Sequence, residues 1–177
     1  MDSEIAEEEL ADLEEPTRAP VRRVLDQDTI REPIRLLSPR TPLCLAPDAS
    51  LQEAVRVMRE HHVGCVLAVE NDRLAGILTE RDLLLKLEAG DLSRRVRDVM
   101  TPDPEVLRLD DPIVYALHRM SVGGYRHVPL VNDAGRPVGI LAVMDIVHYV
   151  VSFFPSDVLT LPLDPTRSET WRERDGA

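Results

Sequence analysis

The sequence predicts an α/β (α+β) fold in which two pseudo-symmetric β-α-β-β-α halves pack as one module. Two repeated segments carry this prediction: LQEAVRVM at Leu51–Met58 recurs as IVYALHRM at Ile113–Met120, 62 positions later. GILTERD at Gly76–Asp82 recurs as GILAVMD at Gly139–Asp145, 63 positions later, so one extra residue lies in a turn between the two signatures. A unit of about 60 residues is marginal as an independent domain, and we expect the copies to share one core.

The first copy carries the signal of each element in chain order. Ser50 and Glu53 have the spacing of a capping box, which predicts a helix start after Ser50. Cys65–Val69 is an unbroken apolar run of strand length, and Asn71-Asp72 is a turn signal. We therefore expect a strand at Pro42–Leu45, a helix at Leu51–His61, strands at Cys65–Val69 and Leu74–Leu78, and a helix at Glu80–Leu87.

The second copy repeats this order. Asp111 is expected as an N-cap with Pro112 at the first helical position, a common place for proline. Asn132–Gly135 predicts the turn between two strands. We expect a strand at Val106–Leu109, a helix from Pro112 to about Ser121, strands at His127–Val131 and Val138–Leu141, and a helix at Val143–Val151.

This order of elements, with the signatures G-h-h-T-x-x-D and G-h-h-x-x-x-D, resembles a tandem pair of cystathionine beta-synthase (CBS) domains, also called a Bateman module. The resemblance places one CBS domain at residues 34–90 and another at 96–151. It implies two clefts about a pseudo-two-fold axis that take adenosine-containing ligands: AMP, ADP, ATP, NAD or S-adenosylmethionine. It also implies a homodimeric sensor rather than an enzyme, with the nucleotide as a regulatory ligand and no cofactor.

The first signature has residues suited to such a ligand. Thr79 ends a strand and opens a helix, where free backbone N–H groups and its hydroxyl suit a phosphate. Asp82 can accept hydrogen bonds from both hydroxyls of a ribose, and Gly76 lets a neighbouring chain or ring approach the strand. The same Thr79–Asp82 spacing is also a capping box, which needs no ligand.

The second signature departs from the first, because Ala142 replaces the hydroxyl-bearing residue while Asp145 is retained. The site at Asp145 is therefore in doubt. Arg126 offers a planar fork suited to phosphate, and His127 can add a charge near neutral pH; the alternatives are a strand-end charge and a core histidine. With Ile77, Pro129 and Gly139, the residues implied for ligand binding are Gly76, Ile77, Thr79, Asp82, Arg126, His127, Pro129, Gly139 and Asp145.

Charge and composition exclude several classes of function. The net charge is −11, but residues 1–16 hold eight acids and no base, which predicts an acidic disordered tail over residues 1–20 or an interaction tail. No basic stripe suggests nucleic acid, and no apolar run suggests a leader or a membrane span. Cys44 and Cys65 lack metal or disulfide spacing, so we expect reduced thiols and a cytoplasmic protein. We find no metal or catalytic motif.

Leu83–Leu87 and Ile146–Val151 carry apolar side chains around more than one helical stripe, which predicts a second buried face and a homodimer. Residues 152–177 are expected to form a C-terminal extension, and we expect its apolar run Val158–Leu163 either to fold back on the dimer or to dock on another protein. The predicted function is a non-catalytic sensor of adenosine-containing ligands. The alternatives are a ligand-free structural adaptor and a detached regulatory subunit that docks on a partner protein.

Overall fold

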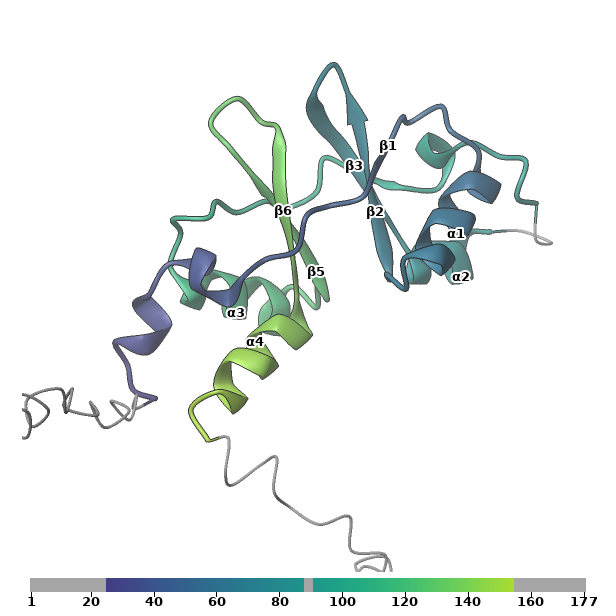
Figure 1. Ribbon diagram of the computed structural model, residues 1–177. Helices are drawn as coiled ribbons and strands as arrows, with labels where there is room; N and C mark the ends of the chain where they lie inside the picture. The colour runs from purple at the N-terminus through teal and green to yellow at the C-terminus, as the bar shows by residue number, and fades with distance from the viewer. Residues whose placement is uncertain (1–24, 88–90, 155–177) are drawn as a thin grey trace, which may run out of the picture.

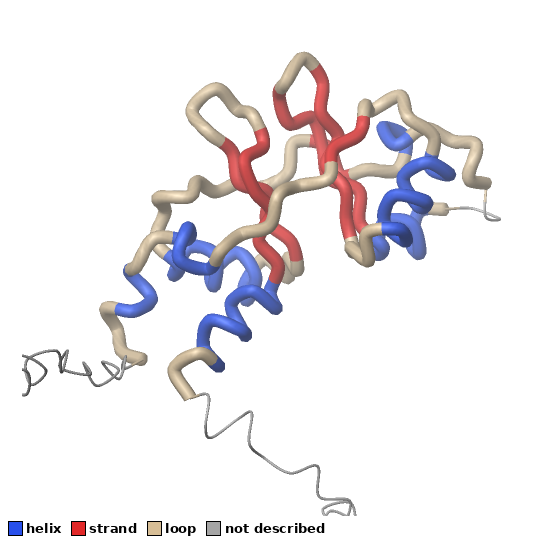
Figure 2. Tube along the Cα trace, in the orientation of Figure 1, coloured by secondary structure: helices blue, strands red, loops and turns tan. Residues whose placement is uncertain are grey.

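The computed structural model describes residues 25–87 and 91–154. Two halves lie side by side, each with an antiparallel hairpin and a pair of helices (Figure 1). The strands gather in the middle of the molecule and the helices lie below them on either side (Figure 2). The predicted mixed α/β fold with two repeated halves is therefore confirmed. The expected tail at 1–20 and the run Val158–Leu163 fall outside the described residues.

The first half is a mixed sheet flanked by two helices. Its elements are β1 (Cys44–Leu45), α1 (Leu51–Glu60), β2 (Cys65–Glu70), β3 (Arg73–Thr79), α2 (Glu80–Lys86) and β4 (Thr101–Pro102). In the described chain the strand order is β1-β2-β3-β4, and only the β1–β2 pair is parallel. The Ser50 side chain accepts a hydrogen bond from the Glu53 N–H at 3.1 Å, which confirms the predicted start of α1. Asn71 and Asp72 have φ of 50° and 61°, as a tight two-residue hairpin turn requires.

The second half contains α3 (Ile113–Val122), β5 (His127–Val131), β6 (Pro137–Ala142) and α4 (Val143–Val151). The expected strand at Val106–Leu109 is wrong, since only Leu107 forms a bridge, parallel to Leu130. Leu107 exchanges backbone hydrogen bonds with Pro129 and Val131, and a turn closed by the Arg108 N–H and the Asp111 carboxylate at 2.8 Å follows at once. Asp111 therefore does not cap α3, and Pro112 occupies the N-cap position without a side-chain hydrogen bond.

The segment that precedes the first half packs on the second half. It includes short 3-10 helices at Thr29–Arg31 and Ile34–Leu37, and it lies beside α3 and α4 (Figure 1). The Ile34 N–H donates to the Asp111 carbonyl at 2.9 Å, and the Ile113 N–H donates to the Glu32 carbonyl at 2.9 Å. The Ile34 and Leu37 side chains are buried in the core of the second half.

The segment that precedes the second half packs on the first half in the same way. The Val96 N–H donates to the Ala49 carbonyl at 2.9 Å, and the Leu51 N–H donates to the Arg94 carbonyl at 2.8 Å. Val96 and Val99 are buried in the core of the first half. Each of these positions lies 62 residues from its counterpart in the other segment. The internal repeat therefore includes these exchanged segments, and the packing crosses the expected sequence boundaries at 34–90 and 96–151.

The two halves also meet along their sheets. Cys65, Leu67 and Ile77 of the first half form a cluster against Ile140 of the second. Burial, with the Glu80 carboxylate nearby, raises the pKa of the Cys65 thiol to about 12. Cys65 and the exposed Cys44 are both free, as expected for reduced thiols.

Replacing Ile34 with Ala tests the exchanged segment. Ile34 is 0% exposed, and we expect Ile34→Ala to lower the free energy of unfolding by about 2 to 5 kcal/mol through lost burial and a cavity. Urea denaturation measures the change. Leu36→Ala is the matched control, because Leu36 is 44% exposed in the same segment and should change stability by about 0.5 kcal/mol or less. Equal small losses for both variants would contradict the role of this segment in the core.

Candidate functional site

A cleft of about 520 Å³ lies between the two halves. One wall comes from the end of β3 and from α2, and the other from the loop after α3 and the start of β5. Six of the nine predicted ligand-binding residues line it: Ile77, Thr79, Asp82, Arg126, His127 and Pro129. The fold therefore brings together two groups of residues that are far apart in the sequence.

Asp82 is the most constrained polar residue of the cleft. One carboxylate oxygen, Oδ2, accepts hydrogen bonds from the Thr79 backbone N–H at 3.0 Å and from the Thr79 hydroxyl at 2.6 Å. The other, Oδ1, contacts Lys86 Nζ at 2.6 Å and accepts from the Thr101 hydroxyl at 3.2 Å. The Asp82 N–H returns a bond to Thr79 Oγ1, so the predicted capping box is confirmed.

The Asp82 side chain is only 11% exposed, and its charge is held by its neighbours. Burial alone would raise the pKa of Asp82, but hydrogen bonds from Lys86 and Thr79 outweigh burial and hold the pKa below its usual value. Asp82 is thus an ionised acceptor that already stabilises the start of α2 without a ligand. A role in binding ribose stays a prediction.

The opposite wall follows a loop with two glycines. Gly124 has φ +69°, which places Arg126 and His127 at the mouth of the cleft. A β-carbon at Gly64 would lie 3.3 Å from His127 Cε1, so the glycine leaves room for the imidazole ring. Burial, with help from the Arg126 guanidinium, lowers the pKa of His127 despite the nearby Glu80 carboxylate. Burial therefore favours the neutral imidazole in the ligand-free protein, and a charge on His127 toward a ligand stays a prediction.

The other three predicted residues do not line this cleft. A β-carbon at Gly76 would lie 2.4 Å from Met100 Sδ, so the protein's own side chain fills that space. A β-carbon at Gly139 would lie 3.1 Å from Leu130 Cδ1. Asp145 lies in a separate polar cleft of about 450 Å³. The two glycines therefore serve packing within the chain.

The cleft at Asp145 is the counterpart of the first cleft in the repeat. Asp145 accepts a hydrogen bond from the Ala142 N–H at 2.7 Å, and its other oxygen lies 3.7 Å from Arg40 Nε. The acid therefore has the same place at a helix start, but an arginine of its own chain stands beside it.

The two clefts differ at every equivalent polar position except the acid. Around the first cleft stand Thr79, Arg81, Lys86, Arg126 and His127; their counterparts in the repeat are Ala142, Met144, Tyr149, Gly64 and Cys65. At these equivalent positions the positive charges and the hydroxyl beside the acid belong to the first cleft, whereas the arginine that lines the second cleft, Arg40, comes from the leading segment. Arg81, Lys86 and Thr101 were not among the predicted site residues. A comparison of the two copies position by position would have indicated Arg81 and Lys86.

The CBS domain family model matches the chain twice, over residues 30–89 and 96–152. The chain belongs to the CBS domain family. It is therefore a tandem CBS pair, as the repeated signatures predicted.

Known proteins share this CBS pair to different extents. The CBS domain-containing protein CBSCBSPB3 of Arabidopsis thaliana is 33% identical over 111 residues, which cover 61% of this chain and 20% of that protein. The chain thus spans about a fifth of the length of this relative. The CBS-domain containing protein ATU1752 from Agrobacterium tumefaciens is 28% identical with a TM-score of 0.61, covering 67% of this chain and 98% of that one. The CBS domain protein PAE2072 from Pyrobaculum aerophilum, solved with AMP, has 23% identity and a TM-score of 0.61 over 70% of this chain and 99% of that one.

Across residues 25–87 and 91–154, no three His, Cys, Asp or Glu side chains gather in a way that could hold a metal ion. None of the helices in these ranges has the length and apolar content that a membrane crossing needs.

Replacing Asp82 with Ala tests its structural role. We expect Asp82→Ala to lower the free energy of unfolding of the ligand-free protein by about 1 to 3 kcal/mol, because the variant loses the cap of α2 and leaves Lys86 unpaired. The folded-state pKa of Asp82 lies below the unfolded value, so this contribution is present at neutral pH. The difference in the free energy of unfolding between wild type and Asp82→Ala should therefore become smaller as the pH falls below about 3.9.

Denaturant unfolding at several pH values measures this change, with Glu60→Ala as the control. Glu60 is an exposed helical acid paired with Arg56, and its loss should change stability by about 0.5 kcal/mol or less. If Asp82→Ala costs no more than Glu60→Ala, the hydrogen bonds around Asp82 do not stabilise the fold.

Proposed function

We propose that this CBS pair is a non-catalytic sensor that binds one adenosine-containing ligand per chain, in the cleft lined by Thr79, Asp82 and Arg126. The contrast between the two clefts carries this proposal. The first acid has a hydroxyl at Thr79 and arginines without an ion pair in the described chain near it, whereas Ala142 and Met144 take the equivalent places in the second copy and the one arginine beside Asp145, Arg40, is paired with it. An anionic ligand with polar sugar hydroxyls matches the first set and not the second.

Each part of an adenine nucleotide has a chemical counterpart in the first cleft. The ionised Asp82 carboxylate can accept hydrogen bonds from ribose hydroxyls, and Arg126 can bind a phosphate through its planar fork. Ile77 and Pro129 form a buried apolar base of the cleft, and Tyr125, which is 43% exposed in its lining, supplies apolar surface for a purine ring. The likeness to the AMP-bound protein from Pyrobaculum aerophilum shows the fold alone, so AMP enters here as one candidate among several to test.

In this proposal the second cleft has a structural role. Arg40 stands beside Asp145, and the hydroxyl that a phosphate would meet in the first cleft is absent at Ala142. Arg40 also exchanges two backbone hydrogen bonds with Ile140, at 3.2 and 3.0 Å. The acid and the arginine together hold the leading segment of the chain against β6.

Calorimetric titration of AMP, ADP, ATP, NAD and S-adenosylmethionine tests the sensor function. We expect at least one to bind with micromolar affinity and a stoichiometry of one per chain. At about 100 times Kd, binding should stabilise the protein by about 2.7 kcal/mol and raise Tm by about 5 to 11 °C. Arg126→Gln should weaken binding about tenfold or more, while Arg108→Gln, a control with a 61% exposed side chain paired with Asp133, should not. A flat titration for every compound would favour the structural adaptor instead.

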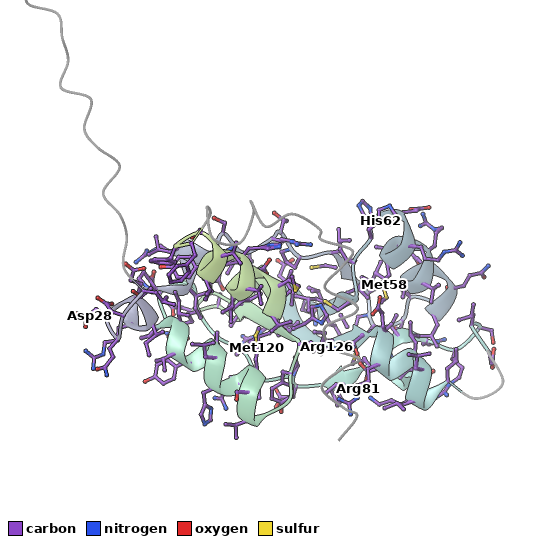
Figure 3. The ribbon with its side chains drawn as sticks, turned by 90° about the horizontal axis from the view of Figure 1, so that it is seen from below. Asp28, Met58, His62, Arg81, Met120 and Arg126 are labelled. Carbon is purple, nitrogen blue, oxygen red and sulfur yellow. The ribbon has the colours of Figure 1, made fainter. Side chains whose placement is uncertain are left out.

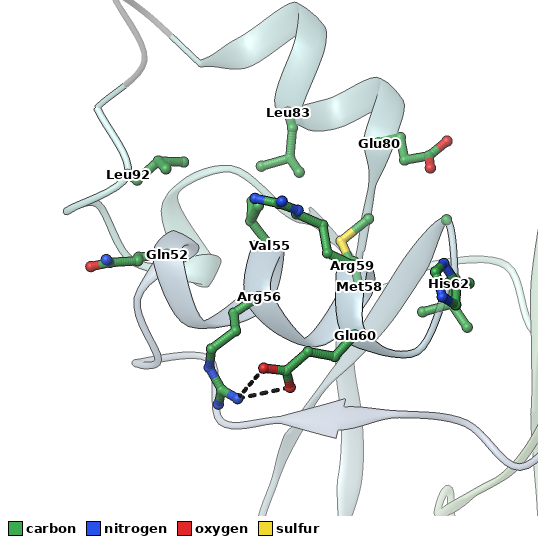
Figure 4. A pocket seen from close by; sticks show the side chains of 12 residues that line it. Gln52, Val55, Arg56, Met58, Arg59, Glu60, His62, Glu80, Leu83 and Leu92 are labelled. Carbon is green, nitrogen blue, oxygen red and sulfur yellow. Dashed lines mark hydrogen bonds and ion pairs between the residues drawn. The ribbon is translucent and has the colours of Figure 1, made fainter.

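We also propose that the sensor is a homodimer formed through its helices. A groove of about 1070 Å³ lies between α1 and α2, where Val55, Met58 and Leu83 face it among charged side chains (Figure 4). A second groove, of about 450 Å³, lies between α3 and α4 and is mostly apolar. Leu84 and Leu85 on α2 are 83% and 72% exposed, which is unusual for leucine unless another surface covers it.

Sedimentation velocity at micromolar concentration tests the assembly. We expect wild type to sediment at twice the monomer mass of 19.9 kDa, and Leu84→Glu to sediment as a monomer because it places a charge on the helical face. Val138→Glu on β6 is the control, since Val138 is exposed away from the helices, and it should remain dimeric. A wild-type protein that stays at 19.9 kDa throughout this range rules out the dimer.

A further inference from the structure

Two arginines that line the first cleft have no ion pair in the described chain. Arg81 comes from the first turn of α2 and Arg126 from the loop before β5, so each half supplies one. Figure 3 labels them close together where the two halves meet. Neither guanidinium lies within ion-pair distance of a described carboxylate.

The other charged side chains of the cleft are mostly neutralised by partners. Lys86 is paired with Asp82 at 2.6 Å. Glu105 is paired with Arg119 at 3.1 Å, which points its charge toward α3. Among the described lining residues this leaves two positive guanidiniums and the carboxylate of Asp103 without ion-pair partners. The cleft therefore carries free positive charge before any ligand enters.

The stability of α2 does not explain why an arginine stands at position 81. Cations are unfavourable in the first turn of a helix, where the exposed backbone N–H groups already carry partial positive charge. The other first-turn positions of α2 include Glu80 and Asp82, which suit that environment. The equivalent residue of α4 is Met144, so the fold does not require a charge at this position.

We propose that Arg81 is a specificity-determining residue of this cleft, which together with Arg126 selects nucleoside di- and triphosphates over the monophosphate. The inference rests on the proposed function. One phosphate group can be matched by Arg126 alone, whereas a longer and more negative chain engages a guanidinium from each half. The sulfonium of S-adenosylmethionine is repelled by both arginines. A ligand that bridges Arg81 and Arg126 also joins the two halves across the cleft.

Calorimetric titration of adenosine, AMP, ADP and ATP into wild type, Arg81→Gln and Arg108→Gln tests this selectivity. Wild type should bind ADP and ATP at least about tenfold more tightly than AMP. Arg81→Gln should lower the affinity for ADP and ATP about tenfold and change the affinity for AMP by about twofold or less. Arg108→Gln removes the same charge from an exposed site that is paired with Asp133 outside the cleft lining, and it should leave the affinities for all four compounds unchanged.

A second variant separates specificity from folding. Arg81→Met copies Met144 of the second half, keeps an unbranched side chain suited to a helix, and should reproduce the effect of Arg81→Gln. If wild type binds AMP as tightly as ATP, or if both Arg81 variants weaken AMP as much as ATP, the selectivity is overturned while the sensor function stands. If wild type binds none of the four compounds or any other adenosine-containing ligand tested, the sensor function and the selectivity fall together.

Discussion

The exchange of leading segments between the two halves is the contact on which the rest of the structure depends. Ile34 completes the core of the second half and Val96 completes the core of the first, through hydrogen bonds that repeat position by position. Halves of about 60 residues bury too little surface to be stable alone, so each relies on residues delivered by the other. The cleft lies between these halves, and the same contacts fix the separation of its walls.

The sequence predicted most of the regular elements because their signals are local. The apolar run at Cys65–Val69 and the capping residues at Ser50 and Thr79 act within a few residues of the chain. The strand expected near Leu107 is reduced to a single bridge, because a turn closed by the Asp111 carboxylate begins at Arg108. The exchanged segments were not predicted, because Ile34 and Val96 belong to no recognisable motif and their partners are distant in sequence.

The candidate site was predicted only in part, because its motifs are local while several of its contacts form only in the folded chain. The sequence grouped Thr79 with Asp82 at one signature and Arg126 with the other copy, whereas the fold brings all three to one cleft. A ligand contact at Gly76 stays a prediction, and within the chain Met100 packs against this glycine. Burial of Asp82 could not be read from the motif, because it depends on Thr101 and Lys86 closing over the carboxylate. Contacts of this kind form only when segments that are distant in the sequence come together in the fold.

The exchanged segments have the geometry of a domain swap contained in one chain. Two separate single-copy chains could complete each other only by associating, at a cost in translational and rotational freedom. A covalent link makes the same closure intramolecular, at an effective concentration on the order of millimolar. A symmetric pair of identical chains must also carry the same residues in both clefts. When both copies lie in one chain, each can change independently. Thr79 and Ala142, or Arg81 and Met144, can therefore stand at equivalent positions in one molecule.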